Sequence, residues 1–265
     1  MTELVSLTGE AGNFTATLRQ KPRYVDMDIC IGCGVCAEKC PRKAADEYNV
    51  GLSKRKAIYI KYSQTVPLKY AIDPDNCIYF KKGTCKACEK FCPSGAINLD
   101  EQEQTFPVQV GAVVVATGFA PFDPAVFDTY GYGKYPGVVT SLEFERILSA
   151  SGPFAGHVVR PADNHHPKKI AWLQCVGSRD TKPGSHSYCS GVCCMYAIKQ
   201  AVIAQEHAGG ELETAIFFMD MRTYGKDFDR YYQKAQHEAG VRFVRCRVHS
   251  LSPAGLGSHD LKLEW

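Results

Sequence analysis

Apolar and polar residues alternate in the first part of the chain, a pattern that predicts short strands. The alternation is clearest at 13–18, which we interpret as a strand of a hairpin that begins near Gly12. Further short strands are expected at 57–62 and 66–68, whereas the basic residues at 53–56 are typical of a solvated turn. This part of the chain is therefore predicted to hold only short elements.

The pattern changes at 111–118, where β-branched residues follow one another without interruption. Such a run is expected for a strand of a parallel sheet that is covered on both faces. The run ends at Ala116, Thr117 and Gly118. These small residues either close a core strand or allow the backbone to approach a dinucleotide, because ligands of open α/β sheets bind at the carboxyl ends of strands.

In the second half, strands alternate with helices that begin at capping residues or end at glycines. This order indicates βαβ units and a parallel sheet. The elements expected here are a helix at 142–148, a strand at 169–173, a helix at 193–207, a strand at 214–219, a helix at 227–239 and a strand at 241–245. The fold class predicted for this region is therefore α/β.

A run of four cysteines suggests the chemistry of the first half. Cys30, Cys33 and Cys36 are spaced three residues apart, and Cys40 follows with Pro41 directly behind it. This is the bacterial ferredoxin ligand run, in which the fourth thiolate binds the other cluster. The first run therefore predicts a second.

The second run lies 37 residues further on, at Cys77, Cys85, Cys88, Cys92 and Pro93. Its first gap holds seven residues instead of two, and the rest of the run is intact. We expect two [4Fe-4S] clusters with interchanged fourth ligands. The predicted ligand sets are Cys30, Cys33, Cys36 and Cys92 for one cluster, and Cys40, Cys77, Cys85 and Cys88 for the other.

Zinc and disulfides are the alternatives for these cysteines. Zinc sites usually pair two cysteines with two more and do not use a run that ends in proline. Disulfides require an oxidising compartment, and the N-terminus has no pattern of a secretory signal. Iron–sulfur ligation is the interpretation that the spacing favours.

Length and charge narrow the class of protein. The chain has 265 residues, 45% of them hydrophobic, enough for one large or two smaller cores. No apolar run reaches the length of a membrane span, so a soluble protein without a transmembrane segment is expected. The formal charge of +3 leaves the 13 cysteines neutral. Three bound clusters would bring the net charge to about −3, so a surface for nucleic acid is not indicated.

A third group of cysteines stands where a dinucleotide domain normally has its glycine fingerprint. Cys175 follows the strand at 169–173, and Cys189, Cys193 and Cys194 precede or begin the next helix. No ordinary spacing rule covers this set. An iron–sulfur cluster, a redox disulfide and buried structural cysteines all remain open from the residues alone. The remaining cysteine, Cys246, is interpreted as a buried free thiol.

Four sequence motifs together resemble the A subunit of heterodisulfide reductase and its relatives, among them subunits of a quinone-interacting oxidoreductase complex. These motifs are the Pro-Arg-Tyr-Val at 22–25 with the first cysteine run, the Val-Val-Val-Ala-Thr-Gly-Phe at 113–119, the Cys-Val-Gly-Ser-Arg-Asp at 175–180, and the Tyr-Cys-Ser-Gly-Val-Cys-Cys at 188–194. The resemblance extends over almost the whole chain.

The resemblance implies a ferredoxin module inserted in a thioredoxin-reductase-like, Rossmann-type flavoprotein domain. It assigns 1–25 to the flavoprotein domain, 26–104 to the inserted α+β module with two clusters, and 105–265 to an incomplete parallel-sheet domain. It also implies that the third cysteine group holds a further [4Fe-4S] cluster near FAD. The ligands implied for that cluster are Cys175, Cys189, Cys193 and Cys194.

Family members carry a glycine-rich FAD fingerprint upstream of this sequence, which we therefore expect to be an internal portion or a truncated member. Ala116, Thr117 and Gly118 would supply half of a flavin site. Lys199 is a candidate for stabilising an anionic reduced flavin, although it fits a surface lysine on an amphipathic helix equally well. The residues at 220–222 either line the site or form a solvated turn, which we favour.

The function expected from these observations is an oxidoreductase subunit that relays electrons between FAD and partner subunits. The expected partners are other subunits of a heterodisulfide-reductase-like or quinone-interacting complex, with a ferredoxin, hydrogenase or dehydrogenase as electron donor. Terminal substrate chemistry is expected elsewhere in the complex, and the location is expected to be cytoplasmic, with membrane association only through partners. The alternatives are a flavin-free ferredoxin-like carrier and a zinc-stabilised docking module without catalytic activity.

Overall fold

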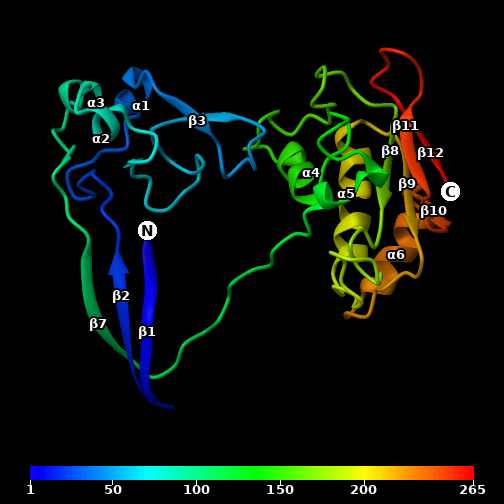
Figure 1. Cartoon of the computed structure of the whole chain (residues 1–265), viewed down its shortest axis with the longest axis horizontal. Helices are drawn as coiled ribbons and strands as arrows, with labels where there is room; N and C mark the ends of the chain where they lie inside the picture. The colour runs from blue at the N-terminus through cyan, green and yellow to red at the C-terminus, as the bar shows by residue number, and fades with distance from the viewer. The chain divides into compact units, whose positions relative to one another are not determined.

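The computed structural model describes all residues from 1 to 265 and divides into two compact units (Figure 1). Unit 1 comprises Met1–Phe119 and unit 2 comprises Ala120–Trp265. Each unit has its own buried core and is described by itself. The three-part division by function remains a prediction.

Unit 1 begins with the expected hairpin. β1 (Thr2–Glu10) pairs antiparallel with β2 (Asn13–Gln20), and β2 pairs antiparallel with β7 (Gln104–Val110) on its other edge. The sheet order is β1-β2-β7, so the chain leaves the sheet at β2 and returns to it at β7. The segment between these two strands forms a separate small module within the unit (Figure 1).

That module is built from helices of four or five residues and two-stranded ladders of two or three residues per strand. Its core consists of Ile58, Ile72, Val25 and Leu99 together with several cysteines. The buried apolar side chains are few, which is consistent with a module that relies on its ligands for stability. Its elements are α1 (Val35–Lys39), β3 (Lys43–Ala45), β4 (Lys54–Lys56), β5 (Ile58–Tyr59), β6 (Ala71–Ile72), α2 (Ile78–Lys82) and α3 (Ala87–Lys90).

Two local expectations for this module are wrong. The basic residues expected to form a solvated turn are strand β4, and the Arg55 side chain is buried against Asp73, with Nη2 and Oδ2 2.9 Å apart. The strand expected at 66–68 does not form, and the one expected at 57–62 is reduced to β5. The burial of the Arg55 side chain is explained by its partners. The ion pair with Asp73 and the Tyr59 ring beneath the guanidinium replace the water that it loses on burial.

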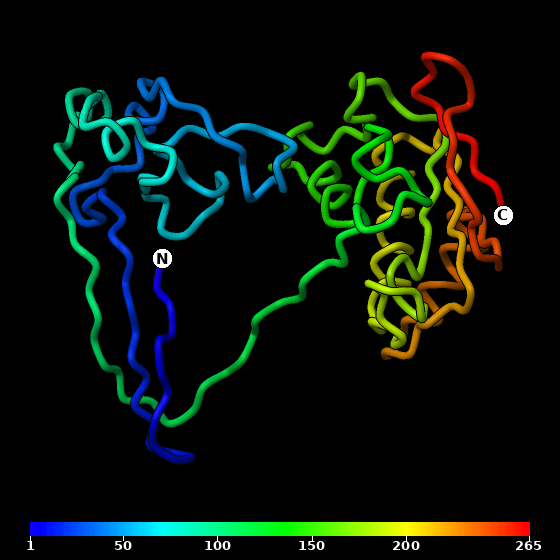
Figure 2. Tube along the Cα trace, viewed as in Figure 1, coloured from blue at the N-terminus to red at the C-terminus, as the bar shows by residue number.

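The strand predicted at 111–118 is also wrong for this chain. The segment is extended but pairs with no other strand, and its side chains face solvent, with Val114 89% exposed. Figure 2 shows it as a long stretch of chain that follows β7. A β-branched run predicts an extended backbone, but only neighbouring strands turn that backbone into a sheet.

Unit 2 contains the predicted parallel sheet, in the order β10-β9-β8. β9 (Glu213–Phe218) lies in the middle, with β8 (Lys169–Leu173) and β10 (Arg242–Arg245) parallel to it on either side. Helix α5 (Cys193–His207) connects β8 with β9, and α6 (Phe228–His237) connects β9 with β10. The βαβ order predicted from the sequence is therefore confirmed.

Helix α4 (Ser141–Leu148) packs on α5 and begins with the capping box that the sequence indicates. Thr140 Oγ1 accepts the Glu143 amide at 3.2 Å, and the Glu143 carboxylate accepts the Thr140 amide at 2.6 Å. Buried Gln200 of α5 connects β8 with α4, since its side chain accepts a hydrogen bond from the Trp172 indole and donates one to the Ser141 carbonyl. Four further elements have no counterpart in the predicted set: η1 (Pro124–Val126), η2 (Asp128–Tyr130), β11 (Ser250–Pro253) and β12 (Leu261–Glu264).

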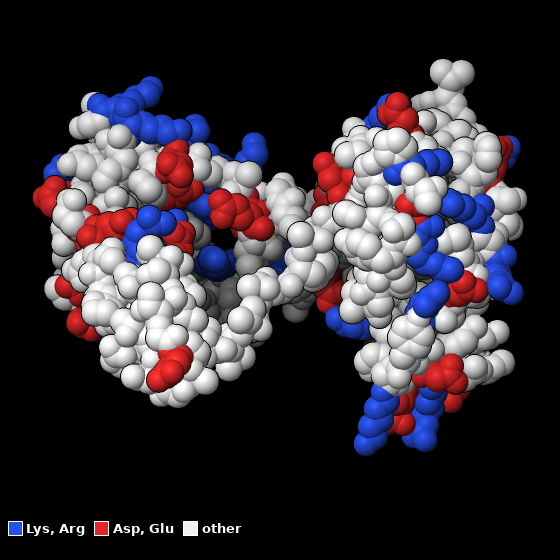
Figure 3. Space-filling model, turned by 60° about the horizontal axis from the view of Figure 1, so that its bottom comes forward, with Lys and Arg blue, Asp and Glu red and all other residues white.

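The surface charge is mixed. Lysine and arginine side chains lie beside aspartate and glutamate over much of the face shown in Figure 3, in keeping with 31 basic and 28 acidic residues. None of the helices combines the length and apolar character needed to span a bilayer.

Candidate metal centres

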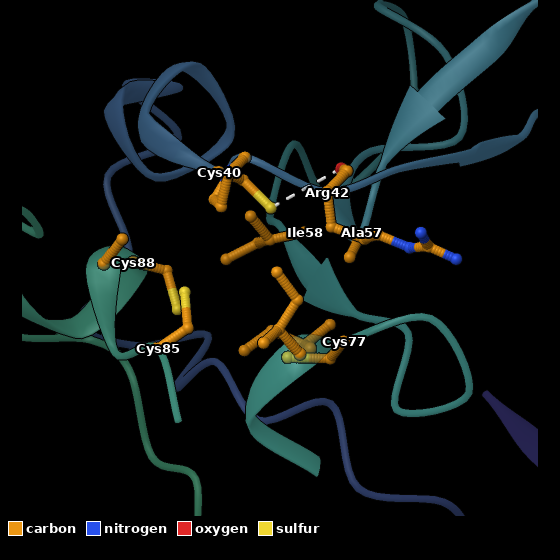
Figure 4. A pocket seen from close by; sticks show the side chains of 11 residues that line it. Cys40, Arg42, Ala57, Ile58, Cys77, Cys85 and Cys88 are labelled. Carbon is orange, nitrogen blue, oxygen red and sulfur yellow. Dashed lines mark hydrogen bonds between the residues drawn. The ribbon is translucent and has the colours of Figure 1, made fainter. Parts of the chain in front are cut away.

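One pocket of unit 1 is lined by four thiols from three parts of the chain (Figure 4). Cys40 enters from the end of α1, Cys77 from the residue before α2, and Cys85 and Cys88 from the turn and helix that follow. The rest of the lining is mainly apolar, including Ile58 and Ile72, and the empty volume including its open part is about 330 Å³. This pocket thus presents thiols to a space from which most other polar groups are missing.

Helix α2 explains the long gap in the second cysteine run. Five of the seven residues between Cys77 and Cys85 form one helical turn, which Gly83 closes in a left-handed conformation with its amide bound to the Tyr79 carbonyl. The extra residues therefore form a structured loop beside the pocket. The sequence signal for this helix is a glycine at the end of a short apolar–basic segment, and the prediction for this region missed it.

A second pocket is lined by Cys30, Cys33, Cys36 and Cys92. Its remaining walls are largely apolar, and its empty volume including the open part is about 290 Å³. Tyr70 also lines this pocket, and burial together with the nearby thiols of Cys36, Cys33 and Cys30 raises the pKa of its hydroxyl.

The two pockets exchange their fourth cysteine. Cys40 belongs to the first run but lines the pocket of the second, and Cys92 does the reverse. Nowhere in the structure do three histidine, cysteine or acidic side chains lie close enough to share a single metal ion. Two four-thiol pockets that interchange one cysteine match the ligand pattern of two-cluster ferredoxins, which zinc sites do not use.

Hydrogen bonds anchor the chain around these pockets. The Asp73 carbonyl accepts the Cys77 amide at 2.9 Å, and the Asp73 carboxylate holds Arg55. Lys69 donates to the Cys30 carbonyl and Lys56 donates to the Cys40 carbonyl. These contacts fix the backbone at three of the cysteines.

The thiols differ in acidity. Burial raises the pKa of Cys36 to about 12 and that of Cys88 to about 11. Burial acts in the same direction on Cys92, but hydrogen bonds from the Ser94 hydroxyl and the Ala96 amide outweigh it and lower the pKa. Because the thiolate is the ligand, the buried thiols become good ligands only when a cation enters and displaces their protons.

The third cysteine group assembles at the carboxyl edge of the parallel sheet in unit 2. Cys175 follows β8, and Cys193 and Cys194 are the first residues of α5. Burial and the charges of Cys193 and Cys189 raise the pKa of Cys175, so these thiols lie within electrostatic reach of one another. Cys194 completes the group, with its Sγ 3.8 Å from the Asp220 carbonyl oxygen.

The Cys193 thiol is more acidic than an ordinary cysteine. The hydrogen bond from Cys194, together with the Ser190 hydroxyl and the amides at the start of α5, lowers its pKa against the effect of burial. The same bond and burial raise the pKa of Cys194. A thiolate at a helix N-terminus is the ordinary form of a reactive or metal-binding cysteine.

Arginine and aspartate side chains surround the third group. Arg179 donates from Nη2 to Asp220 Oδ2 at 2.7 Å, and Arg245 donates from Nη2 to the other carboxylate oxygen at 3.1 Å. At 220–222 the structure has a bend followed by irregular, half-buried chain, and the solvated-turn interpretation that we favoured missed that Asp220 borders the cysteines. Its place at the end of β9, the same edge at which Cys175 ends β8, could have indicated this.

The flavin candidates lie in different units. Ala116, Thr117 and Gly118 belong to the exposed extended segment of unit 1. Lys199 lies on α5 in unit 2 and forms an ion pair with Glu145 of α4, with Nζ and Oε1 2.7 Å apart. Cys246 is half-buried, not fully buried as expected, and all 13 cysteines are free thiols.

Comparison with known protein families supports the nature of the first two centres. Residues 29–96 match the family model described as a 4Fe-4S dicluster domain. This range contains both ferredoxin-type cysteine runs, from Cys30 to Cys92.

Longer relatives match nearly the whole chain. The A-type iron-sulfur subunit of the CoB--CoM heterodisulfide reductase of Methanocaldococcus jannaschii is 45% identical over 92% of this chain and 36% of its own length. The A-type subunit of the ferredoxin:CoB-CoM heterodisulfide reductase of Methanosarcina acetivorans is 41% identical over 93% and 34%. A protein of Archaeoglobus profundus that is named as similar to the heterodisulfide reductase A-type subunit is 38% identical over 93% and 40%. The chain thus spans little more than a third of the length of these relatives.

Proposed function

Because the chain belongs, over the 92% that aligns, to the family of A-type subunits of heterodisulfide reductase, we propose that it transfers electrons through iron–sulfur centres in a complex of that type. The observation that carries the proposal is the exchange of Cys40 and Cys92 between the two thiol pockets. A structural zinc module has no need for this exchange, whereas two neighbouring clusters in one small module are built in this way.

The proposed centres are three [4Fe-4S] clusters, each of which accepts and passes one electron at a time when bound. The chain supplies thiolates, excludes water with apolar walls and donates hydrogen bonds to sulfur, as the Ala96 amide does to Cys92 at 3.4 Å. Such donors stabilise the more negative, reduced state. The proposed ligand sets are Cys30, Cys33, Cys36 and Cys92, then Cys40, Cys77, Cys85 and Cys88, and finally Cys175, Cys189, Cys193 and Cys194.

FAD is proposed as the redox partner of the third centre, in a thioredoxin-reductase-like domain that chain beyond this sequence would complete. The exposure of 113–119 supports this, because an apolar extended segment without sheet partners is suited to pair with further strands. Ala116, Thr117 and Gly118 would then face the flavin, with Lys199 as the candidate cation. To contact the flavin, Lys199 would first have to break its ion pair with Glu145.

The proposed partners are the other subunits of a heterodisulfide-reductase-type complex in the cytoplasm, together with an electron donor such as a ferredoxin. The names of the relatives support this, since one of them is named as part of a ferredoxin:CoB-CoM heterodisulfide reductase. The terminal disulfide chemistry is assigned to another subunit.

The test compares two variants. One replaces Cys40, which belongs to the first run but lines the pocket of the second, and the other replaces Cys246, which lies outside the three ligand sets. We expect Cys40→Ser to lower the iron and sulfide content of the anaerobically reconstituted chain by about one four-iron cluster. Cys246→Ser, the matched control, leaves the content unchanged. Full iron content in Cys40→Ser, or stoichiometric zinc in the unchanged protein, would contradict the proposal.

A flavin-free carrier is the second candidate, favoured by the exposure of Ala116, Thr117 and Gly118 in this chain. Release of flavin on denaturation of the longer protein that contains this sequence distinguishes the two functions. The electron-transfer role of the two ferredoxin-type centres is common to both.

A further inference from the structure

Arg179 is fixed beside the third cysteine group by its backbone. The Ser178 amide donates to the Cys175 carbonyl at 3.2 Å, and the Arg179 amide donates to the Tyr188 carbonyl at 3.2 Å. Cys175 and Arg179 both have positive φ angles, 62° and 56°. Non-glycine residues keep this conformation only where surrounding contacts enforce it, so the turn holds both side chains at a set position.

Of the two terminal nitrogens of the Arg179 guanidinium, one forms a hydrogen bond and the other does not. Nη2 donates to Asp220, and 23% of the side chain is exposed. Nη1 is buried and has no hydrogen-bond partner. A guanidinium is always charged and has donors only, so a buried N–H without an acceptor is costly unless a bound group supplies one.

The acceptor that the site offers is sulfur. The Arg179 guanidinium interacts with the Cys175 side chain, and the turn with positive φ angles at both residues holds it beside that thiol. Arg222 is a second cation near this group, on the side of Cys189, and it donates to the Tyr224 hydroxyl.

We propose that Arg179 donates its buried Nη1–H to a sulfur atom of the third centre and thereby raises the reduction potential of that centre. Asp220 holds the guanidinium in place through its hydrogen bond with Nη2. The inference rests on the proposed function, because it requires a cluster at the third cysteine group. Arg179 is a positioning and charge-compensating residue, since it supplies no ligand.

The direction of the effect follows from charge. Reduction adds one electron to the centre, and the more negative state is stabilised by a nearby positive charge and by a donor to sulfur. Loss of the guanidinium therefore lowers the midpoint potential.

The experiment is an EPR-monitored redox titration of the anaerobically reconstituted chain, in which the signal lost in Cys193→Ser identifies the third centre. We expect Arg179→Gln to shift the midpoint potential of that signal downward and Arg179→Lys, which keeps the charge but not the planar fork, to shift it less. Arg245→Gln is the matched control. It removes the same charge from the same carboxylate, but its side chain is 75% exposed, so its charge is screened and no shift is expected.

An unmoved midpoint in Arg179→Gln, or an equal shift in Arg245→Gln, overturns the proposal. If Arg179→Gln does not retain the third centre, the midpoint potential of that centre is measured in Arg179→Lys instead. An unchanged midpoint potential in Arg179→Lys then also overturns the proposal. Failure of the third centre itself has a different signature, because Cys193→Ser would then remove no signal and no iron from the protein.

Discussion

At the scale of single residues, spacing in the sequence identifies the cysteines that line each pocket. The contacts of charged residues near the pockets are visible only in the folded structure. Cysteine spacing grouped the eight ferredoxin-type thiols as the pockets do, because each run is short and its backbone path is nearly determined by its ligands. Arg55 and Asp220 were misjudged. Both are charged residues in loops by pattern, and both are held by partners 18 or more positions away in sequence.

Gly32, between Cys30 and Cys33, provides a test at this scale. Its φ is +71°, and a Cβ there would lie 2.8 Å from the Leu68 carbonyl oxygen, so Gly32→Ala must move backbone beside the second pocket, the one lined by Cys30. We expect this variant to lose about four irons per chain on reconstitution.

The control is Gly51→Ala. Gly51 has φ +83° and no atom within 4 Å of its added Cβ, so it carries similar backbone strain, about 1–2 kcal/mol, without the clash. Its iron content should equal that of the unchanged protein. A full iron complement in Gly32→Ala would show that the close approach to Leu68 does not shape the site.

At the scale of elements, periodicity predicted helices and paired parallel strands well and isolated strands poorly. The elements α4, α5, α6, β8, β9 and β10 lie within a few residues of their expected positions because caps, glycines and apolar faces agree there. The short helix α2 and the ladder β3-β4 were missed, since elements of three to five residues are defined by tertiary contacts and not by a repeating pattern.

The segment 111–119 has the composition of a β-strand but forms no strand in this chain. Val114 is 89% exposed, so Val114→Ser should change the free energy of unfolding of this chain by no more than about 0.5 kcal/mol. Val241, 2% exposed, is the matched control, and Val241→Ser should cost more than about 2 kcal/mol.

Chemical denaturation under anaerobic conditions measures both values. Equal losses in the two variants would mean that Val114 is buried in the folded chain. In the longer protein, where we propose that this segment joins a larger sheet, Val114→Ser should become destabilising.

At the scale of the whole molecule, the chain consists of two units with their own cores, each carrying its own cysteine centres. The sequence predicted the βαβ order of unit 2 because alternating strand and helix patterns leave few topologies. It mispredicted the apolar run at 111–118, because a strand forms only beside a partner and no strand of this chain pairs with that run.

The central claim is that twelve thiolates hold three four-iron clusters in this one chain. The most direct measurement is Mössbauer spectroscopy of the ⁵⁷Fe-reconstituted protein, combined with iron and sulfide analysis. The account predicts about twelve irons and about twelve sulfides per chain, all in [4Fe-4S] clusters. About eight irons or fewer, or a mononuclear iron or zinc spectrum in place of clusters, would contradict it.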